Sequence, residues 1–229
     1  MNAPLDLEAR DHLERRLRLV VITDRALCRP RSVEDVVEAA LAAGVRAIQL
    51  RCKEASARDL LQSARRLREL ARSWGALLIV NDRVDVALAA GADGVHAGPD
   101  DLPVAELRRA APPPFLVGCS TDDPEAARAA EAAGADYIGC GAVWATTSKD
   151  VQGEAIGVAR LAEVVRAVRI PVVGIGGITM ERVAEVARSG AAGVAVIGAV
   201  MSAGDPEQAA RDLLTTFEAA KSALGGRRG

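Results

Sequence analysis

The chain alternates between short apolar runs and longer segments whose apolar residues follow a helical spacing. The apolar runs have the length and composition of strands that are buried on both faces, as in a parallel sheet. The pattern predicts eight strands, at residues 17–23, 47–50, 77–80, 93–96, 115–119, 136–140, 171–175 and 193–197.

Helices are expected between these strands, because capping residues open several intervening segments and glycine closes most of them. Ser32 with Asp35 has the form of a capping box, and Asp123 followed by Pro124 marks another helix start. The expected helices are 32–44, 56–74, a short alanine-rich helix ending at Gly91, one starting at Pro103, 123–134, 157–168, 179–190 and 206–223. Residues 1–15 are predicted to form a loose helical extension outside the core, and residues 225–229 a frayed tail.

The junctions between helices and strands repeat along the chain. The segments AAGVRAIQL, AAGADGVHAG, AAGADYIGCG and SGAAGVAVIG each join a helix end to a strand. Eight strand–helix units without a break in composition predict one α/β domain over residues 1–229, a single (β/α)8 TIM barrel with an N-terminal helical extension. A doubly wound sheet is the alternative, but its first turn should carry GxGxxG, and Thr23-Asp24-Arg25 does not.

Composition narrows the classes of partner. Half of the 229 residues are hydrophobic, only 2% are aromatic, and the formal net charge is −2. These values argue against nucleic acid and anionic membranes as partners. No apolar stretch is long enough to span a membrane. The four cysteines have no CxxC spacing, which favours a reducing, cytoplasmic location.

Acidic residues follow two consecutive predicted strands. Asn81 and Asp82 come after the third strand, and Asp100 and Asp101 after the fourth. Because adjacent parallel strands end at the same edge, these carboxylates should converge, and hard oxygen ligands favour Mg²⁺. The structural alternative is that Asp82 caps the next helix.

Basic residues follow the second strand, where alternation sends Gln49, Arg51 and Lys53 to one side. Cations beside paired carboxylates indicate a metal-bound polyanion, and a salt-bridged barrel rim is the alternative. The loop after the sixth strand carries Thr146, Ser148 and Lys149 without a GxxxxGK[ST] pattern. Long loops of this kind are often functional, although a solvated loop is the alternative.

Glycines follow the last two strands, at 174–177 and at Gly198. Loops at these positions of a barrel often bind phosphate through backbone N–H groups, with a short extra helix that residues 199–202 could form. Tight turns are the alternative interpretation. Ser120 ends the fifth strand as a hydroxyl donor or a helix cap, and His96 is interpreted as structural.

The motifs, taken together and in order, resemble the thiamine phosphate synthase family over about residues 19–201. They are VITD, QLRCK, NDRVDVALAAGADGVH, DLP, GCS, GADYIGCG, TTSKD, PVVGIGGI and GVAVI. The block from NDR to GVH is the specific one, since GIGGI occurs in many phosphate-binding barrels. The resemblance implies a transferase that joins a hydroxymethylpyrimidine diphosphate to a thiazole phosphate, by Mg²⁺-assisted dissociative loss of diphosphate.

The resemblance also assigns roles to residues. It implies Mg²⁺ ligands at Asp82 and Asp101, and catalytic cations at Arg51, Lys53 and Lys149. The expected substrate-binding residues are Gln49, Arg51, Lys53, Asn81, Ser120, Thr146, Ser148, Lys149, Gly177, Ile197 and Gly198. Both expected substrates are small molecules, and the oligomeric state stays open.

Some positions depart from the family pattern, namely Cys52, Pro99, Asp122, Ala142 and Ala145. None of them removes an expected metal ligand. The alternatives are a thiazole tautomerase of the sister branch and a non-catalytic barrel that binds phosphorylated metabolites. Asp122 stands where a tautomerase is expected to use a histidine base, and the combined acids and cations favour the synthase.

Overall fold

The computed structural model describes residues 7–146 and 155–225. Ser148 and Lys149, the start of the expected extension (1–6) and most of the expected tail (226–229) lie outside the described residues. No helix in the described ranges is long and apolar enough to cross a membrane.

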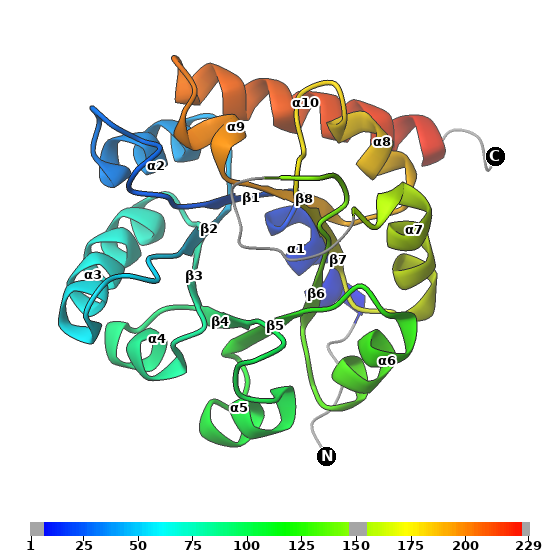
Figure 1. Ribbon diagram of the computed structural model, residues 1–229, viewed down its shortest axis with the longest axis horizontal. Coiled ribbons are helices and arrows are strands. Elements are labelled where there is room, and N and C mark those ends of the chain that lie inside the picture. Colours follow the sequence, from blue (N-terminus) through cyan, green and yellow to red (C-terminus); the bar gives the residue numbers. More distant parts are fainter. Residues whose placement is uncertain (1–6, 147–154, 226–229) are drawn as a thin grey trace.

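Eight parallel strands close into a barrel in the order β1 to β8 (Figure 1). This confirms the predicted fold class, and it excludes the doubly wound sheet because no strand is left at an edge. The strands are β1 (Leu19–Ile22), β2 (Ala47–Leu50), β3 (Leu77–Asn81), β4 (Gly94–Ala97), β5 (Leu116–Ser120), β6 (Tyr137–Cys140), β7 (Val172–Ile175) and β8 (Gly193–Val196).

Helices surround the barrel, as expected of strand–helix units. They are α1 (Leu7–Arg16), α2 (Val33–Ala42), α3 (Ala57–Ser73), α4 (Val84–Ala90), α5 (Val104–Ala110), α6 (Pro124–Ala132), α7 (Gly157–Ala167), α8 (Val183–Arg188), α9 (Gly198–Met201) and α10 (Pro206–Gly225). The short α9 lies where an extra helix was expected after the last strand. The helix predicted from residue 179 begins later, because the N–H groups of Arg182 and Val183 both donate to the Thr179 carbonyl and form a turn first.

The predicted helix signals act through hydrogen bonds. Ser32 and Asp35 form a reciprocal capping box at the start of α2. Asp123 accepts from the Ala126 N–H at the start of α6. Gly91 ends α4 with φ of 64°, a left-handed conformation that glycine adopts at little cost.

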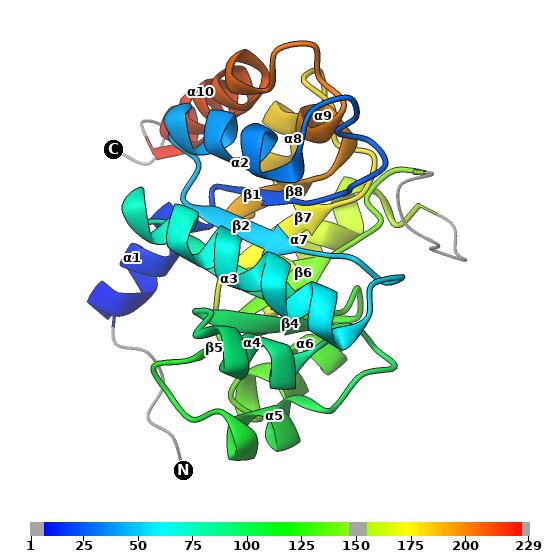
Figure 2. The ribbon, with the colours of Figure 1, turned by 90° about the vertical axis from the view of Figure 1, so that its left-hand side faces the viewer.

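The helix α1 packs on the barrel, and the expectation that the extension lies outside the core is wrong for Leu13. That side chain is 5% exposed and belongs to the main hydrophobic cluster, as does Leu17 just after the helix. Figure 2 shows α1 at the end of the barrel opposite the loops that follow the strands. The helix therefore covers the amino-terminal end of the barrel.

The repeated AGAD junction has a structural reason. Asp93 and Asp136 each accept a hydrogen bond from an N–H group of the preceding strand, that of Leu78 or of Val117, both at 2.7 Å. Each carboxylate thereby ties the start of one strand to its neighbour. Asp136 also forms a buried ion pair with Arg108 of α5. Burial raises the pKa of Asp136, and the Val117 and Arg108 contacts oppose that rise.

Candidate functional site

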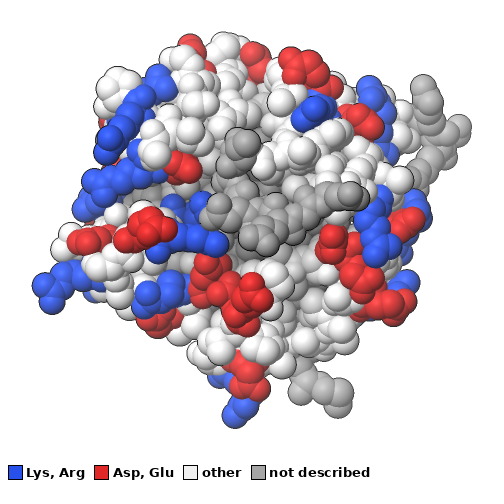
Figure 3. Space-filling view, viewed as in Figure 1, with Lys and Arg blue, Asp and Glu red and all other residues white. Residues whose placement is uncertain are grey.

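A pocket of about 840 Å³ opens at the carboxyl ends of the strands, which we call the barrel mouth. This volume falls within the range of small-molecule sites. Loops after β2 to β8 contribute to its lining, so residues far apart in the sequence meet there. Figure 3 shows basic and acidic side chains next to one another near the centre of this face. The expected site residues that line the pocket are Arg51, Lys53, Asn81, Asp82, Asp101, Ser120, Thr146, Gly177, Ile197 and Gly198.

Asp82 is aimed by an unusual backbone turn. Its φ is 64°, and among the described non-glycine residues it alone has a positive φ. The Arg83 N–H donates to the Asn81 carbonyl at 2.8 Å, and the Asp82 N–H donates to the His96 carbonyl at 2.8 Å. The first of these bonds closes a γ-turn of the rarer, strained hand at the end of β3, and the second ties Asp82 to β4. Strained conformations of this kind cluster at functional sites.

The carboxylates of Asp82 and Asp101 interact with each other in the pocket. Burial, together with the hydrogen bond and charge of Asp101, raises the pKa of Asp82 to about 6, while Lys53 and Arg51 oppose the rise. Asp101 is held in place because its Oδ2 accepts from the Gly98 N–H at 2.7 Å. The loops after β3 and β4 therefore bring two acids to one point, as expected.

The interpretation of Asp82 as a helix cap is wrong. The residue before α4 is Arg83, and no side chain makes a capping hydrogen bond there. The Asp82 carboxylate instead lines the pocket. A carboxylate that is half-buried beside another acid and contributes nothing to the adjacent helix points to a ligand rather than to local stability.

Arg51 is anchored through its backbone and leaves its side chain for the pocket. The Arg51 N–H donates to Thr23 Oγ1 at 3.0 Å, and the Thr23 hydroxyl donates to the Arg51 carbonyl at 3.3 Å. The Nε atom of Arg51 is buried and has no partner among the described residues. A buried guanidinium nitrogen without an acceptor is costly, so this geometry fits an anionic ligand. Lys53 is more exposed and lines the same pocket.

A chain of polar side chains runs below Ser120 inside the barrel. Ser120 Oγ lies 2.9 Å from His96 Nε2, and His96 Nδ1 lies 3.0 Å from the Tyr137 hydroxyl. Tyr137 has its pKa raised by burial and is hydrogen-bonded to Gln49. Gln49 is thus buried in this chain and does not line the pocket, although sequence reasoning placed it with the substrate.

His96, interpreted from the sequence as structural, is buried between Ser120 and Tyr137 and also lines the pocket. It lies opposite Asn81 in the parallel register of β3 and β4. Since paired residues of neighbouring strands point to the same side, Asn81 and His96 both face the pocket that they line. That register was the signal that could have identified it.

The loops after β6 and β7 are joined beyond the ends of their strands. The Val143 N–H donates to the Ile175 carbonyl at 2.9 Å, and the Trp144 N–H donates to the Gly176 carbonyl at 3.1 Å. A Cβ atom on Gly177 would lie 2.8 Å from Trp144 Cβ, so glycine is required for this approach. Glycine therefore does more here than allow a tight turn.

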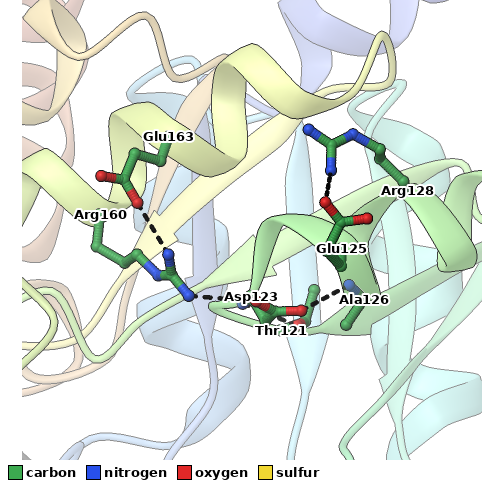
Figure 4. Close-up of polar contacts among 7 residues, drawn as sticks. All are labelled: Thr121, Asp123, Glu125, Ala126, Arg128, Arg160 and Glu163. Atoms are coloured by element: carbon green, nitrogen blue, oxygen red, sulfur yellow. Dashed lines mark hydrogen bonds and ion pairs between the residues drawn. The ribbon is translucent and has the colours of Figure 1, made fainter.

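The loop after β5 forms a further wall of the pocket through Ser120, Thr121 and Asp122. Asp123 fixes its end, because its N–H donates to Thr121 Oγ1 at 3.1 Å and its carboxylate caps α6. Arg160 of α7 pairs with Asp123 at 3.2 Å (Figure 4). The outer contacts of this loop are therefore structural and leave Asp122 at the pocket.

The donor set fits a hard cation that keeps part of its coordination for other ligands. Among residues 7–146 and 155–225, no group of three or more His, Cys, Asp or Glu side chains could hold a metal ion. Two convergent carboxylates with basic residues nearby suit Mg²⁺, which is usually bound through one or two carboxylates, waters and substrate phosphates. Zinc would require more protein ligands.

Comparison with known proteins agrees with this geometry. Residues 19–200 match the family described as thiamine monophosphate synthase. The thiamine-phosphate synthase of Methanoculleus marisnigri is 50% identical over 204 residues, which cover 89% of this chain and 97% of that protein. The thiamine-phosphate synthase of Anaeromyxobacter dehalogenans is 53% identical over 187 residues, covering 82% of this chain and 84% of the relative.

The same similarity extends to a solved structure. The thiamine phosphate pyrophosphorylase from Pyrococcus furiosus superposes with a TM-score of 0.83 at 42% identity, covering 91% of this chain and 98% of that one. The similarity includes the whole barrel, and the matched residues contain the acids and cations described above. On this evidence the chain belongs to the thiamine monophosphate synthase family.

Proposed function

We propose that the pocket at the barrel mouth is where this transferase of thiamine biosynthesis couples 4-amino-5-hydroxymethyl-2-methylpyrimidine diphosphate with a thiazole phosphate. The products are thiamine phosphate and pyrophosphate. One observation carries the proposal: Asp82 and Asp101 face each other in the pocket that Arg51 and Lys53 also line. Paired acids and two cations at one point match a diphosphate that is bound together with a divalent cation.

Asp82 and Asp101 would hold Mg²⁺, which when bound neutralises charge on the leaving diphosphate. Arg51 and Lys53 bind the diphosphate oxygens, and the partnerless Nε of Arg51 supplies one donor. Asn81 lies beside them in the lining. Lys149, which the resemblance assigns to the same anion, is proposed as a third cation.

The reaction needs a stabilised leaving group more than it needs a nucleophile from the protein. The bond between the pyrimidine methylene carbon and the diphosphate oxygen breaks with both electrons going to oxygen. The thiazole nitrogen then donates its lone pair to form the new carbon–nitrogen bond. Negative charge develops on the departing oxygens in the transition state. Cations fixed around these oxygens stabilise that state more than the bound substrate and so accelerate the reaction.

The remaining pocket residues divide between the two substrates. Ser120 is proposed to contact the pyrimidine, with Gln49 acting from below through Tyr137 and His96. Thr146 and Ser148 are proposed for the thiazole. The backbone of Gly177, Ile197 and Gly198 is proposed for its phosphate, at loops typical of barrel phosphate sites.

Two observations weigh against the alternative functions. A tautomerase of the sister branch is expected to use a histidine base, and that position holds Asp122 at the edge of the pocket. A barrel that only binds phosphorylated metabolites needs the glycine loops but does not need two acids held together against their mutual repulsion.

Release of pyrophosphate from the two substrates with Mg²⁺ tests the proposal. Asp82→Asn is the informative variant, because asparagine tolerates the positive φ of this position and only the charge is lost. We expect turnover to fall by roughly 100-fold, the equivalent of a few kcal/mol. Asp85→Asn is the matched control, since Asp85 is exposed and pairs with Arg83. Unchanged turnover in Asp82→Asn would remove Asp82 from the metal site.

A further inference from the structure

Arg182 contacts both the loop after β6 and the loop after β7 at the edge of the pocket. Its guanidinium carbon lies 5.1 Å from the centroid of the Trp144 ring, within the range of a cation–π contact. Its Nη1 donates to the Gly177 carbonyl at 2.7 Å. Trp144 belongs to the loop after β6 and Gly177 to the loop after β7, so one side chain holds both.

The contact of Arg182 lies directly behind residues that line the pocket, so a small displacement of the two loops would change the pocket wall. Thr146 and Gly177 line the pocket, whereas Arg182 and Trp144 do not. The two loops approach so closely that any side chain on Gly177 would collide with Trp144 and Ala145. A shift of the Trp144 backbone would therefore displace the backbone of Gly177, which lines the pocket.

The hydrogen bond also orients a peptide group. The carbonyl and N–H of one trans peptide point in opposite directions. Holding the Gly177 carbonyl toward Arg182 therefore fixes the opposite orientation of the Ile178 N–H, and Ile178 lines the pocket. A planar guanidinium can stack on an aromatic ring and donate in its own plane at once, which a lysine ammonium does less well.

We propose that Arg182 is a positioning residue for the phosphate of the acceptor substrate. It fixes Trp144 against Gly177, so that the backbone after β7 and the loop segment carrying Thr146 present one arrangement to that phosphate. This inference rests on the proposed function, in which the backbone after β7 receives the thiazole phosphate. Arg182 itself does not touch the substrate.

Steady-state kinetics with each substrate varied in turn tests the proposal. Arg182→Ala should raise the KM for the thiazole phosphate about fivefold, the loss expected for one such contact, and leave the KM for the pyrimidine diphosphate unchanged. Arg182→Lys should fall between Arg182→Ala and the wild type. Arg188→Ala is the matched control, because Arg188 is an exposed cation on α8, the helix that directly follows Arg182, and it should alter neither constant.

A binding measurement separates this inference from the proposed function. The chain has two tryptophans, so Trp74→Phe leaves Trp144 as the sole reporter. Titration of that variant with inorganic phosphate should change its fluorescence, and adding Arg182→Ala should weaken the apparent affinity.

The outcomes are distinct. A wild-type protein that releases no pyrophosphate from the two substrates contradicts the proposed function, and the phosphate titration still reports on Arg182. Equal changes in both KM values, or unchanged phosphate affinity and KM in Arg182→Ala, would overturn the positioning role.

Discussion

At the scale of single residues, Asp82 has two features that each raise the free energy of the folded protein. Its backbone is held at a positive φ, and its carboxylate is half-buried beside Asp101. A proton on one acid, or a cation between the two, relieves the repulsion between them, and the strained turn aims the Asp82 carboxylate into the pocket, so both features support a ligand at this point. The sequence predicted both acids from strand order, but no local pattern encodes the turn that aims Asp82.

The raised pKa of Asp82 predicts a pH-dependent response to Mg²⁺. Between the ordinary aspartate pKa of 3.8 and about 6, the folded protein holds a proton that the unfolded chain has released. Stability from this group is therefore present below the ordinary pKa and is lost as pH rises through about 6. In the proposed site Mg²⁺ would take the place of this proton, so Mg²⁺ with pyrophosphate should raise Tm more at about pH 7.5 than at about pH 5.5.

Thermal unfolding of Asp82→Asn provides the control for this response. The variant carries no proton to displace, so its smaller Tm increase with Mg²⁺ should vary little with pH. An equal increase at both pH values in the wild type would contradict a shared ion between Asp82 and Asp101.

At the scale of elements, the strands were predictable because each is an apolar run closed by glycine or a polar residue. Their observed ends differ from the expected ones by up to two residues. The start of α8 was not predictable from Thr179, because the Thr179 hydroxyl donates to Glu181 and no side chain makes a capping hydrogen bond at the start of α8. The role of Asp136 could not be predicted from the sequence either, because its partners Val117 and Arg108 lie on other elements.

The buried ion pair of Arg108 predicts a large effect on stability. Arg108 is 8% exposed and donates to the Gly134 carbonyl at 2.7 Å as well as to Asp136. Arg108→Met leaves the Asp136 carboxylate buried without its cation, and we expect the free energy of unfolding to fall by about 3 kcal/mol in urea denaturation. Arg109→Met, in an exposed pair on the same helix, should change it by less than about 0.5 kcal/mol.

Removing the uncompensated charge of Asp136 should recover part of the lost free energy of unfolding. The double variant Arg108→Met with Asp136→Asn keeps an acceptor for the Val117 N–H but has no buried anion. It is expected to be more stable than Arg108→Met alone. A double variant that is less stable than the single one would show that the loss came from packing.

At the scale of the whole molecule, one end of the barrel carries the site and the other is covered by α1. The repeated junctions predicted the closed barrel, and strand order predicted which residues meet at the mouth. The contribution of α1 could not be predicted, because Leu13 stands in a charged segment and only the assembled barrel offers it an apolar surface. The position of Gln49 below the pocket could not be predicted either, because depth along the barrel decides whether an inward side chain lines the pocket.

This division between the two ends predicts that Leu13→Ala affects stability and spares activity. Leu13 is 5% exposed, and truncation of a buried leucine costs about 2–3 kcal/mol. The midpoint of urea unfolding should fall accordingly, while kcat/KM of the folded protein at moderate temperature stays at the wild-type value. His12→Ala, an exposed neighbour, is the control. A large change in kcat/KM for Leu13→Ala would show that α1 reaches the site.

The position of α1 has a practical consequence for linking this barrel to other molecules. The start of α1 at Leu7 and the end of α10 at Gly225 both lie on the side away from the barrel mouth (Figure 2). A fused enzyme, an affinity tag or a solid support joined directly at Leu7 or Gly225 would therefore sit behind the barrel. Substrates would still reach the barrel mouth, so the protein could be attached to another molecule or to a surface without blocking the site.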